Sequence, residues 1–213
     1  MGPSWLELYG RTTIQAAQRI SNPGCYATST QLLLAPLLPL LDPSAGPTIF
    51  GVSGYSGGGT VAGVNDPDGR PTTVAKVKPD SLGGGIRAYS LTDHIHEREA
   101  RHHLLSLPGA VSATPLHVGF IPHVAPWFSG ILSTLSAPLK KSVTAQEVRD
   151  LYEEKYANEA LLKVLKGVPQ LPDIENKHGW SVGGIQVHSS GRRVVVVVSR
   201  WLCHIVGFRL ILL

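Results

Sequence analysis

Cysteine, charge and targeting signals are scarce in this chain. Of its 213 residues, two are cysteines and 16% are charged. Two cysteines far apart in the sequence do not make a disulfide framework, so the composition indicates a reducing compartment. Residues 1–19 lack the charged n-region and apolar h-region of a secretory signal, and no transit peptide is visible. The chain therefore has the composition of a globular protein that is not secreted.

Runs of basic residues and uncharged hydrophobic stretches are also missing. No Lys/Arg run with interleaved aromatic residues occurs, which argues against nucleic acid as a partner despite the net charge of +4. That charge suits an anionic small molecule. The apolar stretch 194–213 contains Arg200, His204 and Arg209, each costly at a bilayer centre, so we expect no membrane span.

The patterns that are present alternate between helix and strand without internal repeats. Helices are predicted over residues 23–38, ended or kinked near Pro36 and Pro39, over 97–107, and after the capping box that runs from Thr144 to Glu147. The strand-like runs are 48–53, which is predicted to be a buried strand, 114–121, 129–136, 161–165, 180–188 and 193–198. Strands covered by helices on one face indicate an α+β domain with a mixed or antiparallel sheet.

The segment Ser21–Thr28 places a cysteine where a helix should begin. Asn22 is a preferred N-cap, and Pro23 suits the first helical position. Cys25 then lies in the first turn, where free N–H groups and the helix dipole lower the pKa of a thiol. Such a thiolate is a nucleophile, whereas a small buried residue is the commoner fate of a lone cysteine. The residues alone leave both interpretations open.

A second cluster, Tyr89 with His94–Glu99, has side chains suited to proton transfer. Histidine fits because its pKa lies near working pH. His94 and His96 precede a predicted helix and alternate as in an extended segment. We therefore expect their side chains to point apart, with only one of them facing Cys25. The alternative is a pair of surface histidines beside a charged helix start.

A metal site built from His94, His96 and either His102 or His103 is a rival interpretation of this cluster. The sequence offers no carboxylate motif such as HExxH beside these histidines. A metal site would also leave Cys25 unexplained, so we expect no metal ligand here.

The run Gly51–Gly59 resembles a dinucleotide-binding turn only superficially. A Rossmann turn leads directly into a helix and is followed by an acidic residue about twenty positions later. Here the glycines run into Val61–Pro67, which is not helical, and residues 54–85 lack periodicity altogether. A long segment of this kind is usually functional. We expect either a flexible loop or a turn whose glycines let the backbone approach a ligand.

Four ordered blocks together resemble a known family. The blocks are Asn22–Thr28, Gly51–Gly57, Ala88–Tyr89 followed by His94–Glu99, and His117–Pro126. They resemble N-acetyl-gamma-glutamyl-phosphate reductase, the NADPH-dependent enzyme of arginine biosynthesis, and in particular the reductase part of the fungal bifunctional mitochondrial form. The resemblance implies the substrate domain of a glyceraldehyde-3-phosphate-dehydrogenase-like enzyme, a homo-oligomer, and a location in the mitochondrial matrix.

The same resemblance implies roles for individual residues. Cys25 is the nucleophile that attacks an acyl phosphate and forms a thioester, and His94 is the acid/base residue. A hydride from NADPH reduces the thioester to the semialdehyde. The implied substrate-binding residues are Asn22, Ser53, Gly54, Tyr89, His96 and Glu99. The implied nicotinamide contacts are Ser53, Gly54 and Pro126.

Both ends of the chain depart from the family pattern. Only residues 1–20 precede the cysteine motif, where the family has a Rossmann domain, and Ser199–Val206 replaces the family's Asp-Asn-Leu stretch. We therefore expect a remnant or linker at 1–20, a catalytic, substrate and dimerisation domain at 21–198, and an atypical apolar tail at 199–213. Without the surface that binds the NADPH pyrophosphate, this chain alone should have little or no reductase activity.

Two other functions remain open at this point. The chain also fits a non-catalytic dimerisation or regulatory fragment, including a truncated gene product. It also fits an aspartate-semialdehyde-dehydrogenase-like reductase, because that enzyme performs the same chemistry on a different acyl phosphate.

Overall fold

One sheet of seven strands organises the chain. The structure is a computed structural model that describes residues 2–3, 15–16, 18, 20–21, 24–70, 72–107 and 116–201. The strand order in the sheet is β6-β7-β3-β8-β11-β10-β9. Only the pairs β3–β7 and β9–β10 are parallel. The strands are β3 (Thr48–Gly54), β6 (Arg87–Ala88), β7 (Gly119–Ala125), β8 (Ile131–Pro138), β9 (Leu162–Val164), β10 (Trp180–Val187) and β11 (Arg193–Arg200).

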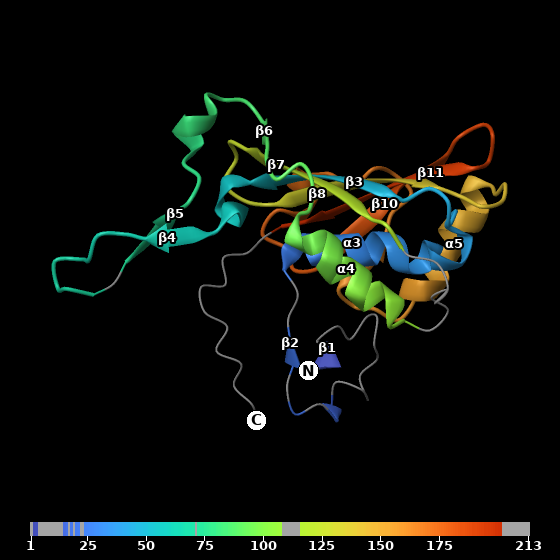
Figure 1. Cartoon of the computed structure of the whole chain (residues 1–213), viewed down its shortest axis with the longest axis horizontal. Coiled ribbons are helices and arrows are strands. Elements are labelled where there is room, and N and C mark those ends of the chain that lie inside the picture. Colours follow the sequence, from blue (N-terminus) through green and yellow to red (C-terminus); the bar gives the residue numbers. More distant parts are fainter. Residues whose placement is uncertain are drawn as a thin grey trace.

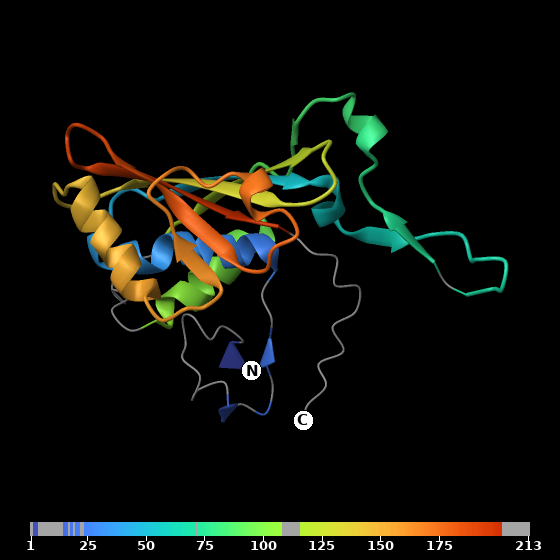
Figure 2. The same cartoon turned by 180° about the vertical axis from the view of Figure 1, so that it is seen from behind.

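Three helices cover one face of this sheet (Figures 1 and 2). They are α3 (Cys25–Leu34), α4 (Ile95–Leu105) and α5 (Ala145–Tyr156). The remaining short helices are α6 (Leu171–Ile174) and the 3-10 turns η1 (Ala35–Leu40), η2 (Tyr55–Gly58) and η3 (Pro79–Leu82). The prediction of an α+β domain with a mixed sheet and helices on one face is confirmed.

Two small strand pairs lie outside the main sheet. The strands β1 (Gly2–Pro3) and β2 (Ile20–Ser21) pair in parallel. The hairpin of β4 (Thr60–Ala62) and β5 (Thr73–Ala75) projects from the body of the domain (Figure 1). The segment 54–85, predicted as unpatterned, therefore contains a hairpin arm between η2 and η3.

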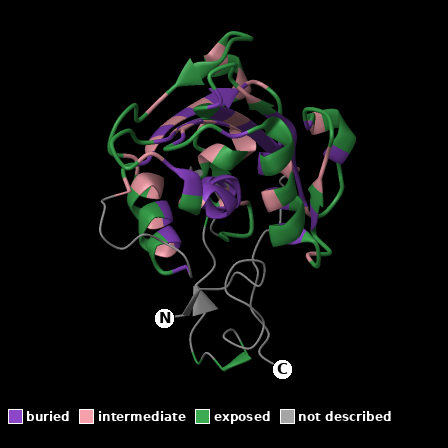
Figure 3. Cartoon of the chain, turned by 90° about the vertical axis from the view of Figure 1, so that its right-hand side faces the viewer, coloured by how far each residue is buried: buried purple, intermediate pink, exposed green. Residues whose placement is uncertain are grey.

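The core fills the space between the sheet and α3, which is buried from Tyr26 to Leu34 (Figure 3). Because α3 is surrounded on all sides, its polar residues need partners inside the protein. The Ser29 hydroxyl is 3.0 Å from the Ser133 hydroxyl of β8. From α5, the hydroxyl groups of Tyr152 and Tyr156 donate to the last-turn carbonyls of Leu33 and Leu32. These bonds fix α3 against both the sheet and α5.

Several local predictions are confirmed. The α-helix α3 ends directly before Ala35-Pro36 and continues as the 3-10 turn η1, as expected from proline. The capping box of Thr144 and Glu147 is formed in both directions at the start of α5. The helix predicted after this capping box is α5, and its Tyr152 and Tyr156 are buried.

Other element boundaries were predicted wrongly. In the run predicted at 114–121, residues 116–118 are not strand, because β7 begins at Gly119 and continues through Pro122 to Ala125; residues 114–115 lie outside the described residues. Proline is tolerated in β7 because position 122 turns its polar groups toward the sheet edge, where its carbonyl accepts from the Tyr89 N–H. Helix α4 begins at Ile95, two residues earlier than predicted.

Two further strand predictions need correction. The run at 48–53 was read as a buried strand, but β3 is buried on one face only, and Phe50 on the other face is 44% exposed. Strand β11 continues beyond Val198 to Arg200, so the first residues of the predicted tail belong to the sheet. Most of the predicted segment 1–20 and residues 202–213, with Cys203, lie outside the described residues. Among the helices that are described, none has the length and apolar character needed to cross a membrane.

Candidate active site

The predicted site residues gather where α3 begins, at the carboxyl ends of β3 and β7. These two parallel strands end together, with Gly54 paired to Ala125. Tyr26, the second residue of α3, packs its ring against Gly51 of β3. The Tyr26 hydroxyl donates to the His123 carbonyl of β7, at 3.2 Å. Tyr26 thus fixes the first turn of α3, and with it Cys25, over this end of the sheet.

Cys25 is the first helical residue, and the N-cap is Gly24. The prediction that Asn22 is the N-cap, with Pro23 at the first helical position, is wrong because the helix begins two residues later. Both residues lie outside the described residues, so the predicted substrate contact of Asn22 has no structural account. Gly24 provides no side-chain cap. The first N–H groups of α3 are consequently left for other acceptors.

The Cys25 thiol lies in an environment that opposes ionisation. Burial raises the pKa of the thiol, and it is the largest effect. The backbone N–H groups of Tyr26 and Cys25 and the positive charge of Arg200 lower this pKa, while Glu99 raises it. The sequence prediction of a lowered thiol pKa is therefore wrong in sign. The helix start acts as expected, but desolvation outweighs it.

The histidine cluster lies beside Cys25 at the start of α4. His94 is the N-cap of α4, and its Nδ1 accepts the backbone N–H of His96 at 3.2 Å. The two imidazole rings have centroids 4.7 Å apart. The prediction that these side chains point apart is wrong, because the chain already turns into the helix at Ile95. Burial is the main cause of a lowered pKa for His94.

His96 is the histidine that packs against the residue preceding Cys25. A Cβ built on Gly24 would lie 3.1 Å from His96 Cε1 and 3.7 Å from His96 Nε2. On its other side, His96 Nδ1 is 2.8 Å from Glu99 Oε2. A carboxylate only accepts hydrogen bonds, so Nδ1 carries the proton and Nε2 is free to exchange one. This arrangement of a carboxylate, an imidazole and a nearby thiol is suited to nucleophilic catalysis.

Tyr89 and Ser53 complete the surroundings of Cys25. Burial and the neighbouring Cys25 raise the pKa of Tyr89 to about 12, so the phenol stays protonated. The same causes raise the pKa of Tyr26 further, whereas the neighbouring Ser53 hydroxyl lowers it. Ser53 is buried at the end of β3. The structure therefore brings Cys25, Tyr89, His96 and Ser53 to one place.

Gly54 and Pro126 lie at the edge of the candidate site, at the carboxyl ends of β3 and β7. Pro126 directly follows Ala125, the partner of Gly54, and is half-buried. A Cβ on Gly54 would lie 2.7 Å from the backbone of Phe128, so packing alone already requires glycine there. The Tyr55 N–H donates to the Trp127 carbonyl at 3.0 Å, which ties the two turns together.

Two residues of the site were missed by sequence reasoning. The sequence prediction gives Tyr26 no role of its own within the cysteine motif and assigns Arg200 to the atypical tail. The alternation of buried valines along β11 is the signal that could have found Arg200, because it puts Val194, Val196, Val198 and position 200 on one face. In the part of the chain that the structure describes, no three His, Cys, Asp or Glu side chains form a group that could hold a metal ion.

A sequence profile of the semialdehyde dehydrogenase dimerisation domain matches residues 25–200. The chain belongs to this family. The match starts at Cys25 and ends at Arg200, so it includes the site described above. The family resemblance read from the sequence is confirmed.

Relatives of the family agree with this assignment. Protein arg11, mitochondrial, of Schizosaccharomyces pombe is 46% identical over 201 residues, covering 92% of this chain and 20% of that protein. Protein arg-6, mitochondrial, of Neurospora crassa is 45% identical over 193 residues, with 91% and 20% covered. N-acetyl-gamma-glutamyl-phosphate reductase of Xanthomonas axonopodis is 39% identical over 203 residues, with 92% and 56% covered. The chain thus spans a fifth of the fungal proteins and about half of the bacterial reductase.

Solved structures show the same fold. Aspartate semialdehyde dehydrogenase II from Vibrio cholerae has a TM-score of 0.62 at 15% identity, covering 92% of this chain and 61% of that chain. The aspartate semialdehyde dehydrogenase from Francisella tularensis has a TM-score of 0.63 at 11% identity, with 93% and 65% covered. At these identities the likeness concerns the fold alone.

Proposed function

We propose that this chain forms the catalytic and substrate-binding part of an NADPH-dependent N-acetyl-gamma-glutamyl-phosphate reductase. The observation that carries the proposal is the contact of the His96–Glu99 pair with Gly24, directly before Cys25. It places a proton acceptor of fixed tautomer beside a buried thiol at a helix start. Relatives named as this reductase, 38–39% identical to the chain, favour the N-acetyl-glutamyl substrate over an aspartyl one.

The first half of the proposed reaction is acyl transfer to Cys25. His96 Nε2 takes the thiol proton, and the sulfur attacks the acyl carbonyl carbon of N-acetyl-glutamyl 5-phosphate. A C–S bond forms, the C–O bond to phosphate breaks, and phosphate leaves with its electron pair. Negative charge on the carbonyl oxygen develops near the start of α3, where free backbone N–H groups can stabilise it. The positively charged His96 is then available to return its proton.

His96 takes the acid/base role here in place of His94, which the resemblance suggested. The Nδ1 of His94 accepts a backbone N–H, so in the neutral imidazole its other nitrogen, Nε2, carries the proton. With its lone pair engaged in this way, His94 cannot accept the thiol proton without giving up the cap of α4. We assign His94 to capping and to packing against Phe120, whose ring centroid is 5.2 Å away.

The nicotinamide end of NADPH fits this end of the sheet. Ser53, Gly54 and Pro126 are the residues that would hold it, and at Gly59 (φ +81°) the turn presents bare backbone to open space. When bound, NADPH supplies the hydride that brings the acyl group to the aldehyde level. In the described part of the chain, β3 leads into the four-residue turn η2 and not into a helix that would bind the pyrophosphate. We therefore expect turnover with NADPH to be weak or absent for this chain alone.

The experiment that tests the proposal is acylation of Cys25, measured by intact-protein mass spectrometry. N-acetyl-glutamyl 5-phosphate is generated in situ by a kinase and ATP, and Cys203 is replaced by alanine so that Cys25 is the single thiol. We expect one N-acetyl-glutamyl group per chain, absent in Cys25→Ala and removed by hydroxylamine. No adduct on the folded chain, or equal labelling by aspartyl phosphate, would count against the proposed substrate.

The location and assembly follow from the same relatives. The fungal relatives are named mitochondrial, and we propose the mitochondrial matrix for this chain. We also propose that it forms a homodimer, as the name of the matched domain suggests. The sheet face opposite α3 supports this, because over β3, β7 and β8 it carries no described helix and leaves Phe50 44% exposed (Figure 1). Dimerisation without catalysis is the second candidate function, and failed acylation of a folded dimer would favour it.

A further inference from the structure

Arg200 is the last residue of β11 and lies at the end of the sheet where the candidate site is. It pairs with Ile131 of β8, which in turn pairs with Ser53 of β3. Two positions further along β8, Ser133 lies on the same face of the sheet and meets Ser29 of α3. The side chain of Arg200 therefore belongs to the helix-covered face, in line with the buried valines that precede it in β11.

Cys25 lies over the paired residues Arg200, Ile131 and Ser53 of the sheet. It precedes Ser29 by four residues, so both share one stripe of α3, with Cys25 one turn nearer the helix start. Four helical residues rise about 6 Å, which is close to the rise of two strand residues. Since Ser29 sits at Ser133, Cys25 sits at the level of Ile131 and its neighbour Arg200. Register and helix spacing thus bring a cation to the nucleophile.

Trp180 of β10 holds the guanidinium in this position. The Arg200 Cζ lies 5.1 Å from the centroid of the Trp180 ring, and Trp180 is itself buried. A guanidinium that stacks on a desolvated ring is fixed in direction and only weakly screened. The positive charge of Arg200 lowers the pKa of the Cys25 thiol, in the opposite direction to Glu99.

We propose that Arg200 is a positioning residue whose charge stabilises the anionic, nucleophilic form of the Cys25 sulfur once the thiol proton has left, which rests on the nucleophilic role proposed for Cys25. The other groups near the sulfur are Tyr26 on α3, Tyr89 before α4, and His94, His96 and Glu99 on α4. Both tyrosines are held neutral by burial, and Glu99 disfavours a second negative charge. His96 moves the thiol proton, and Arg200 supplies a permanent positive charge that remains when His96 is neutral.

The test is the pH dependence of alkylation of Cys25 by iodoacetamide, with Cys203 replaced by alanine. We expect Arg200→Gln to shift the alkylation profile to higher pH and to slow alkylation at pH 8 by roughly tenfold, the effect of one pKa unit. Arg200→Lys should restore most of the rate, because it keeps the charge. Profiles of Arg200→Gln and the unchanged protein that superimpose would overturn the proposal.

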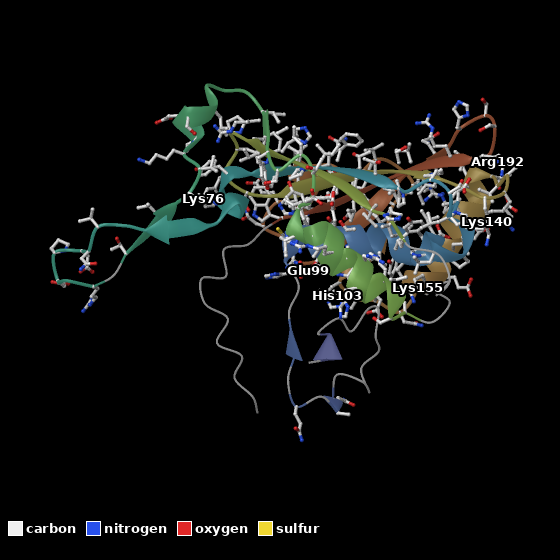
Figure 4. All side chains as sticks on the ribbon, in the orientation of Figure 1. Lys76, Glu99, His103, Lys140, Lys155 and Arg192 are labelled. Carbon is white, nitrogen blue, oxygen red and sulfur yellow. The ribbon has the colours of Figure 1, made fainter. Side chains whose placement is uncertain are left out.

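Arg193→Gln is the matched control, since it removes the same charge from the same strand. Arg193 is exposed at the opposite end of β11 and follows Arg192, which Figure 4 shows far from Glu99. Its alkylation profile should not change. If Arg193→Gln shifted the profile as much as Arg200→Gln, the change in net charge alone would explain the shift. That result would contradict the proposal.

Two measurements keep the proposal testable if Arg200→Gln fails to fold. Arg200→Met is also neutral but keeps an unbranched stem against Trp180, and it should give the same shift. The second measurement uses the unchanged protein and compares the alkylation rates of anionic iodoacetate and neutral iodoacetamide. The ratio of the iodoacetate rate to the iodoacetamide rate should be higher for the folded chain than for the unfolded chain. An equal ratio would count against a positive environment at Cys25. Alkylation needs neither substrate nor NADPH, so failed acylation with a clear Arg200 effect would reject the proposed function alone.

Discussion

The ring of Tyr26 occupies the space that a side chain on Gly51 would need. A Cβ built on Gly51 would lie 2.4 Å from Tyr26 Cε1, closer than any ordinary contact. The same ring packs edge-on against Phe120, with centroids 4.8 Å apart. Because Tyr26 follows Cys25 directly, this contact between β3 and α3 sets the position of the nucleophile.

Gly51→Ala should therefore disturb both stability and reactivity. Moving a buried aromatic ring costs about 1–3 kcal/mol of unfolding free energy. We expect the loss to appear in urea denaturation, together with a changed rate of Cys25 alkylation. Gly167→Ala is the control, because nothing lies within 4 Å of a Cβ at that position. Equal stability of the two variants would contradict the packing role of Gly51.

Replacing His96 and His94 one at a time should distinguish their roles. We expect His96→Asn to slow acylation of Cys25 by about 100-fold or more, since general base catalysis contributes that much. His94→Asn should keep most of the rate, because asparagine is also a good N-cap. The measurement is the rate of thioester formation in rapid-quench mass spectrometry. The reverse order of the two variants would restore His94 as the acid/base residue.

Acid should destabilise the fold through His94. Burial, followed by the neighbouring His96, lowers the pKa of His94 in the folded state. The folded chain then binds fewer protons than the unfolded chain, so this contribution is present above the usual histidine pKa near 6.5 and is lost as pH falls toward the lowered value. His94→Asn should flatten the fall of the melting temperature below pH 7. A fall of the melting temperature that His94→Asn leaves unchanged would contradict this contribution of His94.

The uncovered sheet face should mediate self-association. We expect Phe50→Asp to shift the sedimentation equilibrium toward monomer, because a charge would lie in the centre of the proposed interface. Val64→Asp is the control: Val64 is 89% exposed beyond β4, in the projecting arm. A dimer unaffected by Phe50→Asp would place the interface elsewhere.

Many of the helices and strands could be predicted from local sequence patterns. The capping box of Thr144 and Glu147, the prolines after α3 and the alternating strands each depend on neighbours within a few positions, which is why they were predicted correctly. The first residue of α3 could not be predicted in this way, because Asn22 and Gly24 are both acceptable N-caps and the choice between them depends on packing. The bounds of β7 were misplaced for a similar reason: Pro122 is typical of a turn until it is known that only its carbonyl has to pair with the segment that follows β6.

Local sequence pattern was enough to identify the reactive residues: a cysteine at a helix start, two histidines and a glutamate before and within the next helix, and a glycine-rich turn. The tertiary structure decided how these act. Burial reversed the expected direction of the Cys25 pKa, the early start of α4 brought His96 to Gly24, and strand register brought Arg200 to the sulfur. Desolvation and charge act through space, between residues up to 175 positions apart in the numbering of this chain. No local pattern contains that information.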